Sequence, residues 1–167
     1  MKTALLFDFT VDKETRTVNV QREFAAPLDL VWDAWTKPEI LDQWWAPKPY
    51  RNKTKSIDFR EGGQWLYCMV SPENEVHWCK IDYLKIDPKT SFTGLDAFCD
   101  EDGNTNTEMP RTEWKNSFAE NDRITKVTVV ATYDKLEDLE MVIQMGFQEG
   151  FTMGLNQLEE VLKKLTS

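Results

Sequence analysis

The amino-acid sequence predicts an α+β domain in which a curved antiparallel sheet lies against one long C-terminal helix. Between residues 53 and 133, short segments alternate polar and apolar side chains, which is typical of half-buried strands. Turn-rich stretches join these segments in succession, so neighbouring strands should pair antiparallel. Residues 135–165 instead repeat apolar side chains three and four positions apart, which indicates one amphipathic helix.

Two strands and two short helices are expected in the first part of the chain. Residues 5–9 and 15–24 read as extended segments, the second with clear β-branched alternation. Pro27 suits a helix start, and apolar residues at helical spacing predict a helix over residues 28–36. A second short helix should begin at Pro38 and end before the next proline, because proline cannot continue a helix. The early strand is therefore followed by two inserted helices.

The central part should form successive hairpins. The expected strands are residues 53–59, 64–71, 77–87, 90–99, 111–118 and 123–133. With residues 72–75 as the turn of one hairpin, Cys68 would lie directly opposite Cys79, where a disulfide is a minor alternative to two reduced thiols. In that register two apolar sets would share one face of the sheet: Trp65, Tyr67 and Met69 with Trp78, Leu84 and Ile86.

Glycines and tryptophans at the two ends of the chain predict a close approach between elements. Gly146, Gly150 and Gly154 lie four residues apart on one face of the predicted C-terminal helix. Each costs about 1 kcal/mol relative to alanine, so either the sheet or a ligand should lie close to that face. Trp44 and Trp45 are adjacent on a helix and point about 100° apart. One of them can therefore enter the core while the other lies at the rim of a cavity.

Composition restricts the class of protein. The 167 residues suit a single domain, residues 1–167. The net charge of −9 makes nucleic acid an unfavourable partner, and no basic amphipathic helix favours a membrane surface. No apolar run is long enough to cross a membrane and no signal-peptide pattern is present, so we expect a cytoplasmic protein. We expect a monomer or a weak dimer.

Motifs for catalysis or for metal binding are not apparent. The three cysteines lack metal-ligand spacing, and His77, the only histidine, follows a turn without a nearby nucleophile motif. The sequence contains no phosphate-binding or dinucleotide-binding loop. We therefore expect no metal, no cofactor and no assigned catalytic residue.

Aromatic side chains form 12% of the chain, and they fit either a solid core or the wall of a cavity. Apolar pockets with a few polar groups are the usual form of a small-molecule site. The candidate ligand-binding residues are Trp45, Trp65, Tyr67, Phe98, Trp114, Phe118, Phe147 and Phe151. Asp96 or Asn116 would fix the orientation of the ligand. A buried Asp96 would need hydrogen bonds, partial solvation or a proton.

Several motifs occur in the order of a known superfamily. They are RxFxAPxxxVWxAWTxPExLxQWWAP at residues 22–47, DFREGGxW at 58–65, YLKIDP at 83–88, TxW…F at 112–118 and GFxEGFxxxLxxLEEVL at 146–162. Over about residues 17–165 the chain resembles the SRPBCC (START/Bet v 1-like) superfamily, and most closely the family named for the C-terminal domain of activators of the heat-shock chaperone ATPase. The resemblance implies a helix-grip fold, with about six or seven antiparallel strands around the C-terminal helix and usually a cavity between them.

The resemblance leaves three functions open. Because superfamily cavities hold lipids, sterols, hormones or polyketides, the leading hypothesis is non-enzymatic binding of a small, largely apolar ligand. The family name suggests the alternative of a protein-interaction module that acts as a co-chaperone of a heat-shock chaperone ATPase. Some superfamily members are polyketide cyclases, and a cyclase-type enzyme would need a polar group with a perturbed pKa inside the cavity.

Overall fold

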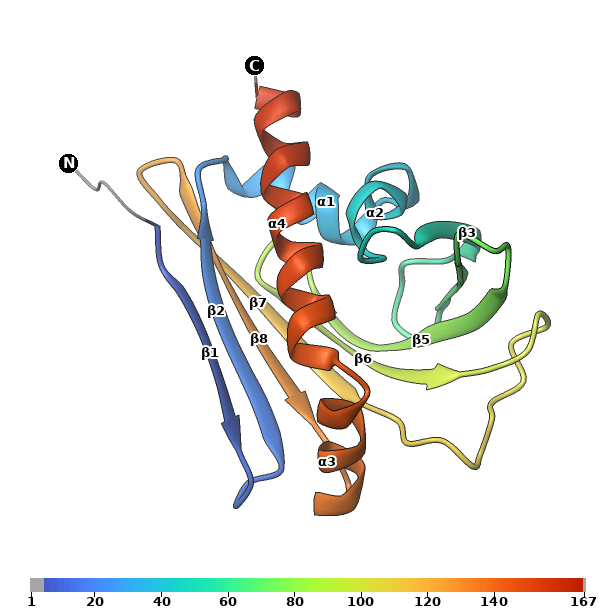
Figure 1. Ribbon diagram of the computed structural model, residues 1–167. Coiled ribbons are helices and arrows are strands. Elements are labelled where there is room, and N and C mark those ends of the chain that lie inside the picture. Colours follow the sequence, from blue (N-terminus) through green and yellow to red (C-terminus); the bar gives the residue numbers. More distant parts are fainter. Residues whose placement is uncertain (1–4, 167) are drawn as a thin grey trace.

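The computed structural model describes residues 5–166, which form one eight-stranded antiparallel sheet and four helices (Figure 1). The strand order is β1-β2-β8-β7-β6-β5-β4-β3. The strands are β1 (Phe7–Asp12), β2 (Thr17–Phe24), β3 (Arg51–Ile57), β4 (Gln64–Val70), β5 (Val76–Asp87), β6 (Ser91–Phe98), β7 (Glu113–Asn121) and β8 (Ile124–Thr132). The helices are α1 (Leu28–Thr36), α2 (Pro38–Trp44), α3 (Leu136–Gln144) and α4 (Phe147–Thr166).

The sheet curves around α4, which lies across its inner face, while α1 and α2 cover one end of the sheet (Figure 1). This arrangement confirms the helix-grip fold, with eight strands where the resemblance implied about six or seven. In β2, for example, apolar residues alternate with polar ones and form part of the inner face, because every second residue of a strand points to the same side. Val18 and Val20 of β2 are fully buried beside their partners Ala131 and Val129 of β8.

The register of the β4–β5 hairpin differs from the expected one by a single residue. Cys68 lies opposite Trp78 rather than Cys79, and Tyr67 is the partner of Cys79. The hairpin loop contains five residues instead of four because the Ser71 hydroxyl accepts hydrogen bonds from two backbone N–H groups within it. The prediction that Cys68 and Cys79 face each other is wrong, and the cysteines are free thiols.

The shifted register exchanges the two faces of β5, because a one-residue slip turns every side chain to the opposite side. Ile81 and Tyr83 are buried on the inner face, where Ile81 is the partner of Trp65. Leu84 is 43% exposed. The predicted face shared by Trp65, Tyr67 and Met69 with Trp78 and Leu84 is therefore wrong. The aromatic inner wall instead continues from β4 through Tyr83.

The C-terminal segment is two helices rather than the single helix that its apolar spacing predicted. Helix α3 ends at Gln144, and Gly146 adopts a φ of +92° before α4 begins at Phe147. A positive φ is accessible to glycine without the steric penalty of a β-carbon. Gly146 thus serves the break between the helices, and only Gly150 and Gly154 remain within α4.

Gly154 provides the close approach that its helix position predicted. A β-carbon built on it would lie 3.3 Å from the carbonyl oxygen of Trp44, at the end of α2. That carbonyl is held in place, since it accepts a hydrogen bond from Gln157 at 3.0 Å. Gly150 faces Pro47, with 3.7 Å between a built β-carbon and the ring. The neighbour of the glycine face is therefore the end of α2 and the loop after it, not the sheet.

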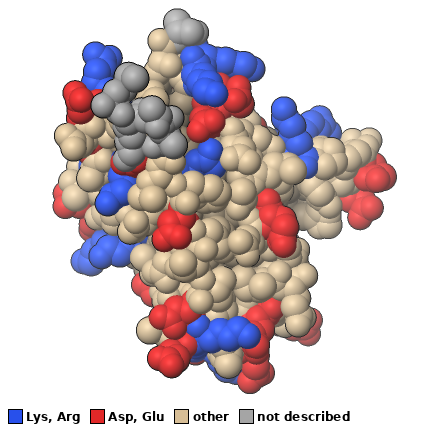
Figure 2. Space-filling model, turned by 60° about the vertical axis from the view of Figure 1, so that its left-hand side comes forward, with Lys and Arg blue, Asp and Glu red and all other residues tan. Residues whose placement is uncertain are grey.

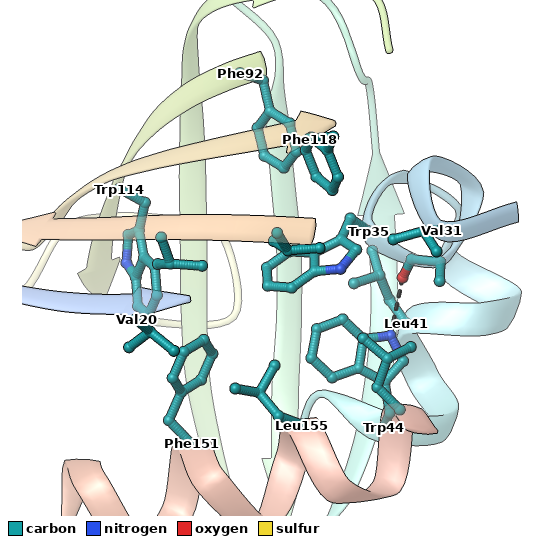
Figure 3. Close-up of a cluster of buried hydrophobic side chains, with 14 of the residues drawn as sticks. Val20, Val31, Trp35, Leu41, Trp44, Phe92, Trp114, Phe118, Phe151 and Leu155 are labelled. Atoms are coloured by element: carbon teal, nitrogen blue, oxygen red, sulfur yellow. Dashed lines mark hydrogen bonds between the residues drawn. The ribbon is translucent and has the colours of Figure 1, made fainter. Parts of the chain in front are cut away.

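Trp44 anchors α2 in the core. Its indole N–H donates to the carbonyl of Ala34 in α1 at 2.8 Å, the dashed line in Figure 3. Its ring meets that of Trp35 edge to face, with 4.9 Å between centroids. Leu41 and Leu155 close the same cluster from α2 and α4 (Figure 3).

Arg22 joins β2 to α4 from within the protein. Its guanidinium donates to the side-chain oxygen of Asn156 at 2.8 Å and to Glu159 at 3.3 Å. It also lies 5.4 Å from the centre of the Phe24 ring. Because Arg22 is only 7% exposed, these partners satisfy a charge that burial would otherwise penalise.

Candidate functional site

A cavity of about 300 Å³ lies between the inner face of the sheet and the C-terminal helices. Strands β4, β5 and β6, the start of β7, the end of β8, the end of α2 and both C-terminal helices contribute to its wall. The lining residues are Trp45, Pro47, Tyr67, Met69, Cys79, Asp96, Ala97, Phe98, Pro110, Thr112, Trp114, Tyr133, Val142, Met145, Gly146, Phe147, Gly150 and Phe151.

Seven of the ten candidate site residues line this cavity. They are Trp45, Tyr67, Asp96, Phe98, Trp114, Phe147 and Phe151. Trp65 and Asn116 instead line an internal space of about 10 Å³, enough for one water molecule at most. Phe118 lines neither space and packs in the core against Trp32, with 5.1 Å between ring centroids. Ligand contact by any of the ten stays a prediction.

Aromatic rings form the wall on the helix side. The rings of Phe147 and Phe151, one turn apart on α4, are stacked with their centroids 5.5 Å apart. Trp114, on β7, contacts Phe151, with 5.5 Å between the ring centroids. The two side chains lie next to each other in Figure 3. Trp45 contacts the same group from the end of α2, at 6.3 Å from Phe151. This arrangement offers flat apolar surfaces from three elements.

The adjacent tryptophans have different positions, which their helical geometry allows. Trp44 is 1% exposed and lies in the core, whereas the half-buried Trp45 borders the cavity. The Trp45 indole N–H donates to the Tyr67 hydroxyl at 3.1 Å. Trp45 therefore presents its ring to the cavity while its polar atom is satisfied within the wall.

Asp96 is the acidic group of the cavity. One carboxylate oxygen accepts from the backbone N–H of Thr112 at 2.7 Å, and the other accepts from the Trp114 indole at 2.9 Å. Burial raises the pKa of Asp96 to about 6, against the lowering effect of these hydrogen bonds and of nearby Arg111. A group with a pKa this far from its usual value, inside an apolar cavity, is a common mark of a functional site.

Arg111 approaches Asp96 but binds elsewhere. Its Nη2 donates to the Asp82 carboxylate at 2.7 Å, and its Nε donates to the backbone carbonyl of Asp96 at 2.9 Å. Burial of Asp82 raises its pKa, but hydrogen bonds from Arg111, Gln64 and Lys80 outweigh burial and leave that pKa below its usual value. The guanidinium thus pairs directly with the Asp82 carboxylate, and it acts on the Asp96 carboxylate only through its charge.

Three further titratable side chains line the cavity, and burial favours the protonated form of each. Burial raises the pKa of Cys79 to about 12 and that of Tyr133 to about 12. Burial also raises the pKa of Tyr67 well above its usual value. Between pH 5 and pH 8, Asp96 is therefore the one lining side chain of the described residues whose charge changes.

Cys79 and Tyr133 were missed in the sequence. The wrong hairpin register turned Cys79 away from Tyr67, and only the five-residue loop makes them cross-strand partners. Tyr133 continues the alternation of buried residues in β8 by one position, through Val129 and Ala131. That period-two pattern was visible in the sequence and could have placed Tyr133 on the inner face.

The described residues offer neither a metal site nor a membrane-spanning helix. No group of three or more His, Cys, Asp or Glu side chains within residues 5–166 is arranged to hold a metal ion. None of the helices in that range is long and apolar enough to cross a membrane. His77 of β5 lies near Tyr50, which directly precedes β3, with 6.3 Å between the ring centroids.

Comparisons with solved structures give the same fold over nearly the whole chain. The chain is similar to protein Ms6760 from Mycobacterium smegmatis, with 33% identity, a TM-score of 0.85, and coverage of 95% of this chain and 97% of that one. A protein from Staphylococcus epidermidis is 29% identical, with a TM-score of 0.82 and coverage of 93% and 94%. The AHSA1 protein from Silicibacter pomeroyi is 20% identical, with a TM-score of 0.69 and coverage of 88% and 97%.

Sequence comparison identifies the family. A search of curated proteins found no match. The family model described as "Activator of Hsp90 ATPase homolog 1-like protein" matches residues 25–163, which is most of the chain. The motifs at both ends, the helix-grip fold and this match agree, and the chain belongs to the Activator of Hsp90 ATPase homolog 1-like family.

Proposed function

We propose that this protein binds a small, largely apolar molecule in the cavity between the sheet and the C-terminal helices, without transforming it. The observation that carries the proposal is the cavity of about 300 Å³ with aromatic walls on three elements. Its volume is at the lower end of the range for small-molecule sites, which are usually apolar with a few polar groups. Asp96 would then orient the ligand by accepting a hydrogen bond.

The composition of the wall supports binding of a flat or ring-containing molecule. Offset stacking or edge-to-face contact with an aromatic ring adds about 0.5–1.5 kcal/mol beyond the burial of apolar area. Such contacts are available from three neighbouring rings whose centroids lie 5.5 Å from one to the next: Phe147, Phe151 and Trp114. Contacts within the protein already hold these side chains in place, so ligand binding would lose little side-chain entropy.

Nuclear magnetic resonance of the tryptophan indoles tests the proposal directly. Trp45 and Trp114 line the cavity, whereas Trp78 lies outside it, near Lys55. We expect 1-methylnaphthalene, as an apolar probe, to shift the indole signals of Trp45 and Trp114 and to leave that of Trp78 unchanged. Equal shifts at all three, or no shift at millimolar probe, would contradict the proposal.

A matched pair of variants separates cavity binding from surface binding. Cys79→Leu adds volume inside the cavity, and Cys99→Leu makes the same change at a cysteine that does not line it. We expect Cys79→Leu to weaken probe binding at least tenfold and Cys99→Leu to leave it unchanged. Either variant is used only if its nuclear magnetic resonance spectrum shows the chemical-shift dispersion of the folded, unmodified protein. Equal affinity of both variants would place the probe outside the cavity.

The two other functions predict different results in the same samples. As a co-chaperone, the protein would stimulate the ATPase of a heat-shock chaperone whether or not the cavity is filled by Cys79→Leu. As a cyclase-type enzyme, it would convert a polyketide-like ligand, and mass spectrometry of the bound fraction would detect the product. Recovery of an unmodified ligand from protein purified from its own host, by native mass spectrometry, favours binding alone.

A further inference from the structure

The charge inside the cavity points to the chemical class of its ligand. Resting on the proposed function, we propose that the cavity selects an apolar, ring-containing molecule with one protonated amine, and that its ammonium group binds the Asp96 carboxylate. The proposal goes beyond apolar binding because it predicts a preference for cations over neutral and anionic molecules of the same shape.

Asp96 is an anion without a cation among its cavity neighbours. Of the described residues that line the cavity, none is a lysine, an arginine or a histidine. Arg111 lies behind the wall, where its guanidinium binds Asp82 and two backbone carbonyls. A carboxylate in an apolar site is costly unless it is paired, and a ligand ammonium would supply the missing partner.

The hydrogen bonds of Asp96 leave room for a ligand. An ionised carboxylate has about four acceptor positions on its two oxygens. The backbone N–H of Thr112 and the indole of Trp114 occupy one position on each oxygen. The Thr112 side chain also lowers the pKa of Asp96 and is allowed one further position. At least one position remains for a donor in the cavity.

The aromatic wall suits the same group. A cation over the face of an aromatic ring, within about 6 Å of its centre, is attracted by the ring, and more strongly when water is excluded. The indole nitrogen of Trp114 donates to Asp96, and the ring of Trp114 contacts that of Phe151. Trp114 therefore connects the carboxylate to the aromatic wall. The net charge of −9 also attracts cations toward the protein and repels anions, while acidic and basic side chains are interspersed on the face shown in Figure 2.

No other titratable group in the wall can take over this role. From β4, β5 and the end of β8, the groups that face Asp96 are Tyr67, Cys79 and Tyr133, which stay neutral below pH 8. The Arg111 guanidinium binds Asp82 behind the wall. The lining residues of α3 and α4 carry no ionisable side chain. Ionisation of Asp96 therefore controls the charge of the cavity near pH 6.

Four probes with one ring system test the preference: 1-naphthylmethylamine, 1-naphthalenemethanol, 1-methylnaphthalene and 1-naphthoic acid. At pH 7.5 we expect the amine to bind at least tenfold more tightly than the alcohol or the hydrocarbon, and the acid most weakly. At pH 5 the amine keeps its proton, but Asp96 is mostly protonated, so amine affinity should fall about tenfold. The affinity of the hydrocarbon should not change.

A pair of variants assigns the preference to Asp96. Asp96→Asn keeps the size of the side chain and removes its charge, and Glu113→Gln removes one exposed charge from β7, two residues from Arg111. We expect Asp96→Asn to abolish both the amine preference and its pH dependence, while Glu113→Gln keeps both. If Asp96→Asn does not fold, the pH dependence of the four probes on the unmodified protein still decides.

The outcomes distinguish this inference from the proposed function. If none of the four probes shifts the Trp45 and Trp114 indoles, the cavity does not bind such molecules and both proposals fail. If all four bind with similar affinity, or if Asp96→Asn keeps the amine preference, the cation inference is overturned and apolar binding stands. Equal binding of the amine and the alcohol at both pH values likewise overturns it.

Discussion

The indole nitrogen of Trp45 lies 3.1 Å from the hydroxyl oxygen of Tyr67, and this hydrogen bond ties the end of α2 to strand β4 in the wall of the cavity. Tyr67 is also the cross-strand partner of Cys79 on β5. The ring of Tyr67 stacks on that of Trp65, with 4.1 Å between centroids. These contacts fix the cavity wall at the junction of helix and sheet.

Removal of the Tyr67 hydroxyl should weaken this junction. Tyr67→Phe leaves the Trp45 N–H without its acceptor, and we expect the free energy of unfolding to fall by about 1–2 kcal/mol. Denaturant unfolding of Tyr67→Phe, Trp45→Phe and the double variant measures the coupling. Effects of the single variants that add up fully would show that the hydrogen bond contributes nothing to stability.

Two alanine substitutions in the glycine series should have opposite signs. Gly146 has a φ of +92°, so Gly146→Ala should destabilise the protein by about 1 kcal/mol or more. A β-carbon at Gly150 meets only Pro47 at 3.7 Å, so Gly150→Ala should stabilise by up to about 1 kcal/mol through helix propensity. Thermal and denaturant unfolding measure both. Stabilisation by Gly146→Ala would contradict the break between α3 and α4.

Asp96 should make stability depend on pH with a definite sign. Burial raises the pKa of Asp96 to about 6 in the folded protein, above its usual value of 3.8, so the folded state binds the proton more tightly. The Asp96 contribution therefore falls as pH rises through this interval and stays low above it. We therefore compare the unfolding free energy of Asp96→Asn with that of the unmodified protein at each pH. This difference should rise by about 1 kcal/mol in favour of Asp96→Asn from pH 5 to pH 8.

Denaturant unfolding at the two pH values measures this double difference. Glu113→Gln, which removes an exposed carboxylate one residue from Trp114, is the charge control. A gain by Asp96→Asn toward low pH would mean that the carboxyl pKa is lowered in the folded protein, contrary to its burial.

The cysteines should all react as thiols. Cys68 and Cys79 are not partners in the β4–β5 register, and the structure has Cys68, Cys79 and Cys99 as free cysteines. Thiol titration in denaturant without reductant should count three thiols for each chain. A count of one would mean that two of the three cysteines form a disulfide, contrary to the structure.

Local patterns predicted most of the fold because they depend on near neighbours in the chain. Pro27 and Pro38 mark the beginnings of α1 and α2, and alternation identifies the strands. Two predictions, the register of the β4–β5 hairpin and a single C-terminal helix, were wrong for a shared reason. In each, one residue changes the geometry: Ser71 extends the loop by its hydrogen bonds, and Gly146 takes a positive φ that no apolar spacing reveals.

By itself the sequence determined the fold class, the family motifs and the aromatic supply of the site, because burial of apolar side chains at fixed periods leaves few architectures. Only the tertiary structure decided where those side chains meet. Asp96 and Trp114 come from different strands, and Phe151 comes from a helix, so their distances depend on sheet curvature and on the position of α4. A cavity is the space that such long-range contacts leave unfilled, and no short stretch of sequence specifies it.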